Sequence, residues 1–84
     1  MEQYKIVSIT HLDGTPREDK HYPNLVGKDI RMYPDCFNVG RHLFGQIKGE
    51  PSIKTSKVKE VSMYGKTIVA RTKNSIYTLE RMED

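Results

Sequence analysis

The chain has 84 residues, of which 36% are hydrophobic and 30% charged, and its formal net charge is +3. This length predicts one domain, residues 1–84, with a modest core, and the hydrophobic content is too high for a disordered chain. No apolar run reaches the roughly 20 residues of a membrane span, and the first residues lack the apolar stretch of a signal peptide, so we expect a cytoplasmic protein without membrane contact.

The first half of the chain predicts three β-strands, because β-branched and alternating apolar residues recur between turn signals. A polar segment at residues 15–23 lacks apolar periodicity and predicts the longest, most flexible loop. Leu25 and Val26 follow it and are expected in the core. Gly40 and Gly45 predict a bulge or sharp bend near the third strand. The predicted strands are residues 4–10, residues 29–33 with Ile30 and Met32 on one face, and residues 41–47.

The last third of the chain predicts a β-meander of three strands with tight turns at residues 64–66 and 73–75. Asn74 is expected to have a positive φ in the second turn, and Thr55-Ser56 could begin one helical turn. The meander must curl against the earlier strands to bury its apolar face. We therefore predict a mainly β fold with little helix, a small, partly open antiparallel barrel of five or six strands. Within the meander, Val61 and Met63 can share one face of the first strand, Ile68, Ala70 and Thr72 alternate on the second, and Tyr77 and Leu79 alternate on the third.

Basic side chains are concentrated in residues 41–73, where eight Lys or Arg face two Glu, a balance of 8 − 2 = +6. The remainder of the chain has six basic and nine acidic side chains, a balance of 6 − 9 = −3. This asymmetry predicts an acidic partner: an acidic protein surface, a phosphate-bearing ligand or nucleic acid. Alternatively, the lysines only keep exposed strands soluble and block edge pairing. The expected partner contacts are Arg41, Lys54, Lys57, Arg71 and Lys73, with Tyr22 and Tyr64 as aromatic anchors.

Neither a catalytic centre nor a metal or cofactor site is predicted. The histidines and the single cysteine lack the close spacing that places two metal ligands on one turn. Cys36, His42 and Asp35 would be the members of a nucleophilic trio, but a small, partly buried thiol is the simpler interpretation. The lone cysteine also predicts that no disulfide forms within the chain.

Residues 55–57, Thr-Ser-Lys, are a candidate anion site because they combine two hydroxyls with a cation. The alternative is a capped turn with no ligand. The six glycines are spread singly, so none of the glycine-rich phosphate loops is predicted.

Exposed aromatic rings beside cations would favour nucleic acid, since bases stack on such rings. Tyr22 and Tyr64 fall in predicted loops or turns and could be exposed. Phe44 and Tyr77 are expected in the core. A nucleic-acid-binding barrel is therefore the alternative to binding of another acidic partner.

The C-terminal part of the chain has the pattern Thr55-Ser56-x-Val58, then Gly65, then Thr72-x-Asn74-Ser75-x-Tyr77-x-Leu79. This pattern resembles that of a group of small uncharacterised proteins from bacteria and their phages, which resemble SH3-like barrels. The match covers roughly the last 30 residues, with a weaker match at residues 25–28. The resemblance implies an SH3-like barrel in a phage or mobile-element setting. Small proteins in that setting often inhibit host defence or trap signalling molecules in the host cytoplasm.

These observations together predict a non-enzymatic binding module that blocks or sequesters a host partner, as an anti-defence inhibitor or a trap for a nucleotide signal. An accessory subunit of a larger particle is a further alternative. An exposed sheet edge in so small a barrel would also favour pairing of two copies into a homodimer.

Overall fold

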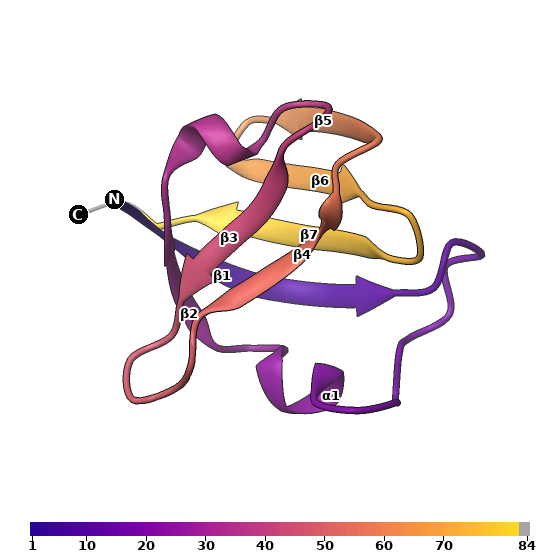
Figure 1. Ribbon diagram of the computed structural model, residues 1–84, viewed down its shortest axis with the longest axis horizontal. Helices are drawn as coiled ribbons and strands as arrows, with labels where there is room; N and C mark the ends of the chain where they lie inside the picture. Colours follow the sequence, from indigo (N-terminus) through magenta and orange to yellow (C-terminus); the bar gives the residue numbers. More distant parts are fainter. Residues whose placement is uncertain (83–84) are drawn as a thin grey trace.

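The computed structural model describes residues 1–82, and in them the chain forms a single seven-stranded antiparallel sheet with little helix (Figure 1). The mainly β class is confirmed, whereas the prediction of five or six strands is wrong by at least one strand. Glu83 and Asp84, which enter the charge balance above, lie outside the described residues. The elements are β1 (Glu2–Thr10), α1 (Tyr22–Leu25), β2 (Asp29–Met32), η1 (Pro34–Cys36), β3 (His42–Gln46), β4 (Ile53–Lys57), β5 (Glu60–Tyr64), β6 (Thr67–Arg71) and β7 (Ile76–Arg81).

The strands follow the order β4-β3-β2-β1-β7-β6-β5 in the sheet. The predicted C-terminal meander is therefore confirmed as β5-β6-β7, and β1 joins it to the meander β2-β3-β4. The sheet curls so that β3 and β4 cross in front of β6 and β7 (Figure 1). This curl buries one face of the sheet, as the sequence pattern predicts.

A bulge at Val7 shifts the pattern of buried residues along β1. The pairing with β7 changes register between Ile6 and Ser8, so Val7 is the extra residue. Tyr4 and Ile6 are buried before the bulge and Ile9 is buried after it, whereas Val7 is 44% exposed. A strict two-residue alternation would have placed Ile9 on the outer face.

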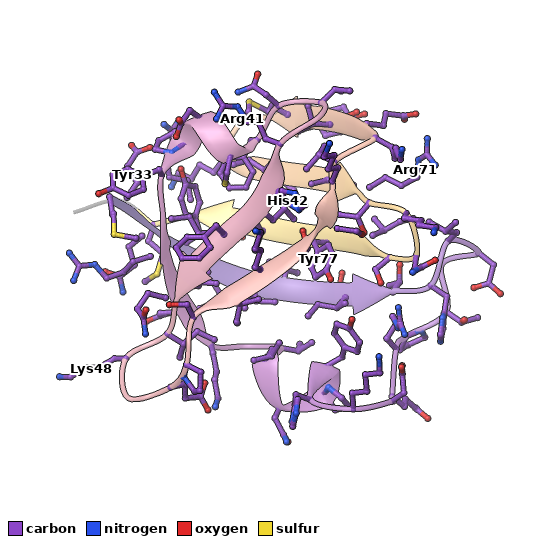
Figure 2. All side chains as sticks on the ribbon, in the orientation of Figure 1. Tyr33, Arg41, His42, Lys48, Arg71 and Tyr77 are labelled. Atoms are coloured by element: carbon purple, nitrogen blue, oxygen red, sulfur yellow. The ribbon has the colours of Figure 1, made fainter. Side chains whose placement is uncertain are left out.

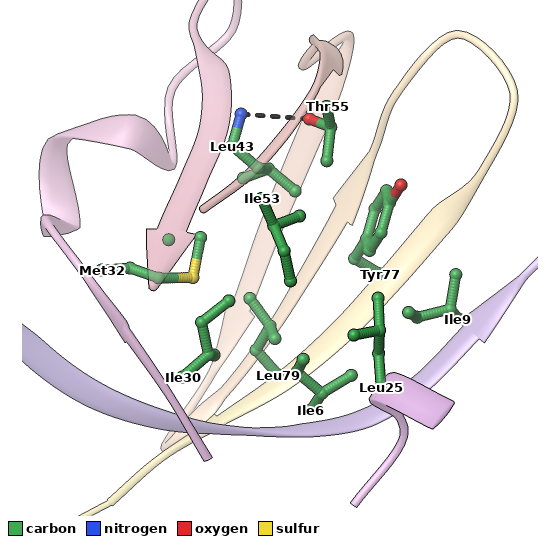
Figure 3. Close-up of a pocket in the computed structure, with 11 residues that line it drawn as sticks. Ile6, Ile9, Leu25, Ile30, Met32, Leu43, Ile53, Thr55, Tyr77 and Leu79 are labelled. Atoms are coloured by element: carbon green, nitrogen blue, oxygen red, sulfur yellow. Dashed lines mark hydrogen bonds between the residues drawn. The ribbon is translucent and has the colours of Figure 1, made fainter. Parts of the chain in front are cut away.

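The additional strand is β4, where the predicted helical turn at Thr55-Ser56 is wrong. Between the pairs His42–Lys57 and Phe44–Lys54, β3 advances two residues and β4 three, which makes a second bulge. The Leu43 amide donates to Thr55 Oγ1 at 3.1 Å (Figure 3). The Thr55 hydroxyl does satisfy a backbone N–H, but that amide belongs to the neighbouring strand rather than to a helix.

Backbone hydrogen bonds at Val58 connect the two edges of the sheet. It lies between the edge strands β4 and β5 and is fully buried. Its amide donates to Arg41 O at 2.7 Å and its carbonyl accepts from the Gly40 amide at 2.9 Å, while the Lys59 amide donates to Arg71 O at 2.7 Å. The sheet is thereby held partly closed here. Among the described residues β5 pairs only with β6, and joining of two copies through its edge stays a prediction.

Gly45 is required by packing. A Cβ on Gly45 would lie 2.5 Å from Ile30 Cδ1 and 2.8 Å from Met32 Cγ, so only glycine lets β3 approach the core side chains of β2. The bulge predicted near this strand is confirmed, but it lies opposite Leu43 on β4.

Several expectations for the loops are wrong. Leu25 and Val26 were both expected in the core, but only Leu25 packs half-buried against it, and Val26, just after the end of α1, is 43% exposed. Asn74 does not have a positive φ; among residues 1–82, Lys20 is the one non-glycine residue that does, at 55°. The loop at residues 15–23 is confirmed as largely irregular, but its backbone is tied to β1 by the bond from the Arg17 amide to Ile9 O at 3.0 Å. In the described part of the chain, no helix has the length and apolarity needed to cross a membrane.

Candidate anion-binding cleft

A cleft of about 280 Å³ opens between β4 and the turn that joins β6 to β7, and the loop before α1 forms its outer wall. Three cationic side chains line it: Arg17, Lys20 and Lys54. None of the described residues that line it is acidic. These cations come from distant parts of the sequence, and the curl of the sheet brings them together.

Arg17 holds the outer wall of the cleft in place. Its Nη1 donates to Ser75 Oγ at 2.6 Å, its Nε and Nη2 donate to the carboxylate of Asp19 at 3.0 and 2.6 Å, and its guanidinium lies 4.4 Å from the centroid of the Tyr22 ring. The side chain is only 12% exposed. The hydrogen bonds from Arg17 hold the pKa of the Asp19 carboxyl at about 2. Arg17 thus joins the loop to the β6–β7 turn, and Asp19 balances part of its charge.

Lys20 and Lys54 supply positive charge that is not balanced in this way. Both residues are exposed, and neither forms an ion pair with another of the described residues. Lys20 also has a left-handed backbone conformation, which for a side chain of this kind costs about 1 kcal/mol. Strained backbone conformations of this kind are common at binding sites, where the surrounding structure holds a side chain in the position that binding requires.

Hydroxyl groups complete the polar part of the cleft. Ser56 is exposed at the rim, and Ser75 is buried and bonded to Arg17. Thr55 Oγ1 is already engaged, because it also donates to Ser56 O at 2.7 Å. Burial, and then the neighbouring Tyr22, raise the pKa of Tyr77. Like any tyrosine phenol at neutral pH, that of Tyr77 carries its proton and can donate a hydrogen bond.

The floor of the cleft is the apolar interior of the sheet. Leu25, Ile53 and the ring of Tyr77 border both the cleft and the small internal cavity of the core (Figure 3). In Figure 3, Ile53 and Tyr77 are both drawn at the border of the internal cavity. The cleft therefore offers an apolar base and a cationic rim to one ligand.

Comparison with protein-family models, curated proteins and solved structures finds no match to this chain.

The structure divides the predicted contact residues between different surfaces. Tyr22, Lys54, Thr55 and Ser56 line the cleft, whereas Lys57, the third member of the predicted anion site, does not. The others lie elsewhere: Arg41 precedes β3, Arg71 ends β6 and approaches Glu60 at 3.5 Å, Lys73 is exposed in the β6–β7 turn, and Tyr64 is 69% exposed beside the β5–β6 turn.

Arg17 and Lys20 were not predicted as contact residues, because the loop that contains them has more acidic than basic side chains. Residues 13–23 contain two basic and three acidic side chains, a balance of 2 − 3 = −1, so a count along the chain points away from them. The available signal was local: Arg17 and Asp19 are two residues apart and their side chains can pair.

Cys36, His42 and Asp35, the members of the alternative trio, all border one hollow of about 290 Å³. Cys36 is buried, and this burial raises the pKa of its thiol. His42 Nδ1 lies 2.7 Å from Thr55 O, and since a carbonyl only accepts, Nδ1 carries the proton. Among residues 1–82, no group of three or more His, Cys, Asp or Glu is placed to hold a metal ion.

Proposed function

We propose that this protein is a non-enzymatic, SH3-like binding module that holds a small phosphate-bearing ligand in the cleft and thereby withdraws it from other proteins. The observation that carries the proposal is the convergence of Arg17, Lys20 and Lys54 on one cleft without a lining carboxylate. A phosphate oxygen accepts charge-assisted hydrogen bonds from such groups, and these are among the stronger polar contacts in proteins.

The volume of the cleft limits the ligand. Pockets for small molecules usually measure about 300–1,000 Å³, and this cleft, at about 280 Å³, lies just below that range. A mononucleotide, or the phosphate-bearing end of a larger molecule, matches that volume. The apolar floor at Leu25 and Ile53 suits a ribose or base better than a free inorganic ion.

Binding without turnover is supported by the state of the best candidate nucleophile. Burial raises the pKa of the Cys36 thiol and disfavours the reactive thiolate at neutral pH. Cys36 also does not line the cleft. A ligand held in the cleft is therefore expected to leave it chemically unchanged, as a trap for a nucleotide signal requires.

Isothermal titration calorimetry with a panel of mononucleotides, cyclic dinucleotides and inorganic pyrophosphate tests the proposal. We expect at least one nucleotide to bind, and Lys20→Asn to weaken its binding about tenfold, since a hydrogen bond to a charged group contributes about 1.5–3 kcal/mol. Asn is chosen because it tolerates the left-handed conformation of Lys20. Lys48→Ala, which changes an exposed lysine outside the cleft, is the matched control.

Failure of every probe to bind at low ionic strength would contradict this function. Mass spectrometry of a bound nucleotide after prolonged incubation checks the other half of the proposal. Recovery of the unaltered ligand supports sequestration, the role that the resemblance to phage proteins implies, whereas a processed product would identify an enzyme.

A further inference from the structure

A second basic surface lies on the outer face of the β3–β4 hairpin and contains exposed aromatic rings. Phe44 was expected in the core, but it is 44% exposed, because it points away from the face on which Leu43 is buried. Tyr33, just after β2, is 57% exposed. Both rings border a hollow of about 290 Å³ that Arg41 and His42 also line. Figure 2 shows Tyr33, Arg41 and His42 on the same side of the molecule.

The register of the hairpin places cations beside these aromatic rings. Lys54 lies opposite Phe44, and Lys57 lies opposite His42. Residues directly opposite on antiparallel strands have their side chains on the same face, about 5 Å apart at Cβ. Arg41, Lys54 and Lys57 thus surround the rings, and Asp35 is the one acidic residue among the described residues that line the hollow.

The His42 ring is held in place by the bond between its Nδ1 and Thr55 O at 2.7 Å. The other ring nitrogen, Nε2, is therefore an acceptor in the neutral imidazole. His42 adds a third, partly exposed ring to the surface.

Packing of the core does not account for Tyr33 and Phe44. Val39, 66% exposed, lies on the segment between them, so exposed apolar side chains concentrate around η1 and β3. Exposed apolar groups gathered beside cations are typical of interaction surfaces. Alternating rings and cations match one polymer in particular, in which phosphates alternate with flat bases.

We propose that this surface binds single-stranded nucleic acid, with bases stacked on Phe44 and Tyr33 and phosphates contacted by Arg41, Lys54 and Lys57. A single strand is required because the faces of the bases in a duplex are already covered by their neighbours. The hollow between the rings has room for one base.

Fluorescence anisotropy with labelled ten-nucleotide oligo(dT) and oligo(rU), and with a DNA duplex of equal length, tests the inference. Both single strands bind at low salt, more tightly than the duplex. Phe44→Ala and Tyr33→Ala each weaken binding about tenfold, the effect expected from the loss of one stacked base. Phe44→Tyr keeps the stacking and binds like the wild-type protein.

Two control variants and the salt dependence distinguish base stacking on this surface from phosphate contacts and from binding in the cleft. Tyr64→Ala removes a ring on β5 that is even more exposed, and it leaves oligonucleotide binding unchanged. Lys20→Asn, a cleft variant, also leaves it unchanged. For single strands, log K falls against log salt with a slope of about −0.7 per phosphate contacted, so three contacts give about −2 and Lys57→Ala reduces this by about 0.7.

Three results would overturn the inference: no affinity for either oligonucleotide at low salt, equal affinity for duplex and single strand, or Phe44→Ala binding that matches Tyr64→Ala. Polyglutamate that competes as well as oligo(dT) would also overturn it and indicate an acidic protein as the partner. A DNA strand and an RNA strand are distinguished by the ratio of the oligo(dT) and oligo(rU) affinities, and thermal unfolding confirms that each variant is folded.

Discussion

The cleft and the outer face of the β3–β4 hairpin are both basic, but they are built differently. The cleft collects its cations from the loop before α1 and from the edge of β4, and it covers an apolar floor. The hairpin face takes its charges from two paired strands and its rings from Tyr33 and Phe44. Both regions carry positive charge, so charge does not indicate which ligand each of them binds. The concave shape of the cleft favours a small ligand, and the exposed rings of the hairpin face favour a polymer.

One strand serves both regions. Ile53 and Thr55 on β4 are half-buried and border the internal cavity, while Lys54 is exposed and lies opposite Phe44. Because side chains alternate along a strand, β4 presents apolar groups to one side and charged groups to the other. Lys54 also reaches the rim of the cleft and is thus common to the two regions.

Gly45→Ala should have the largest effect, because it destabilises the sheet that supports both the cleft and the hairpin face. A Cβ at Gly45 would overlap Ile30 and Met32, and overpacking of this kind costs about 1–3 kcal/mol. For a domain of this size, the melting temperature should fall by roughly 4–24 °C in a thermal unfolding experiment.

Gly65→Asn is the matched control for that experiment. Gly65 has a φ of 60° and open space around the position of a Cβ, and Asn tolerates this conformation. An unfolding temperature for Gly45→Ala that equals that of Gly65→Asn would show that β3 does not depend on its close approach to β2.

Lys54→Ala tests whether the cleft and the hairpin face are two binding surfaces that share this lysine. We expect weaker binding of both a nucleotide and an oligonucleotide, by about three- to tenfold each, because Lys54 contributes a charge to the two regions. Lys57→Ala, the neighbouring control, should weaken only oligonucleotide binding. The two titrations used above measure both effects, and identical profiles for the two variants would mean that the regions are one surface.

The strands of this fold were predictable where alternation is regular. β2, β6 and β7 show clear alternation of apolar side chains, and Ile30, Met32 and Leu79 are buried as expected. β4 was missed because its sequence, Ile-Lys-Thr-Ser-Lys, has one strongly apolar residue and a bulge. Its pairing with β3 and the bond from the Leu43 amide to Thr55 stabilise it, and neither is visible in the local sequence.

The candidate sites were predictable only in part, for the same reason. Lys54, Thr55, Ser56 and Tyr22 were proposed as contacts from composition, and they line the cleft. Arg17 becomes part of it through Ser75, which lies 58 residues away along the chain. Phe44 was misassigned because a ring in a short strand is usually buried, and only the direction of the β3 side chains places it outside.

The smallest expected effect concerns Asp19, whose carboxylate balances part of the charge of Arg17. Hydrogen bonds from Arg17 lower the pKa of Asp19 from 3.8 to about 2. Since the pKa is lower in the folded state, the stabilisation by this pair is complete above about pH 4 and is lost as the pH falls through 2. Thermal unfolding measured from pH 5 to pH 2 should therefore show a shallower decline for Asp19→Asn than for the wild-type protein.

The same Asp19→Asn variant separates the two regions at neutral pH. Removal of one negative charge beside the cleft should raise its affinity for a nucleotide about two- to threefold, since exposed charges at a protein surface interact only weakly. Oligonucleotide binding on the hairpin face should not change. Asp13→Asn is the control, because Asp13 lies in the same loop but bonds to Thr15 rather than to Arg17. If Asp13→Asn strengthens nucleotide binding as much, the cleft responds to the total charge of the loop and not to the balance between Arg17 and Asp19.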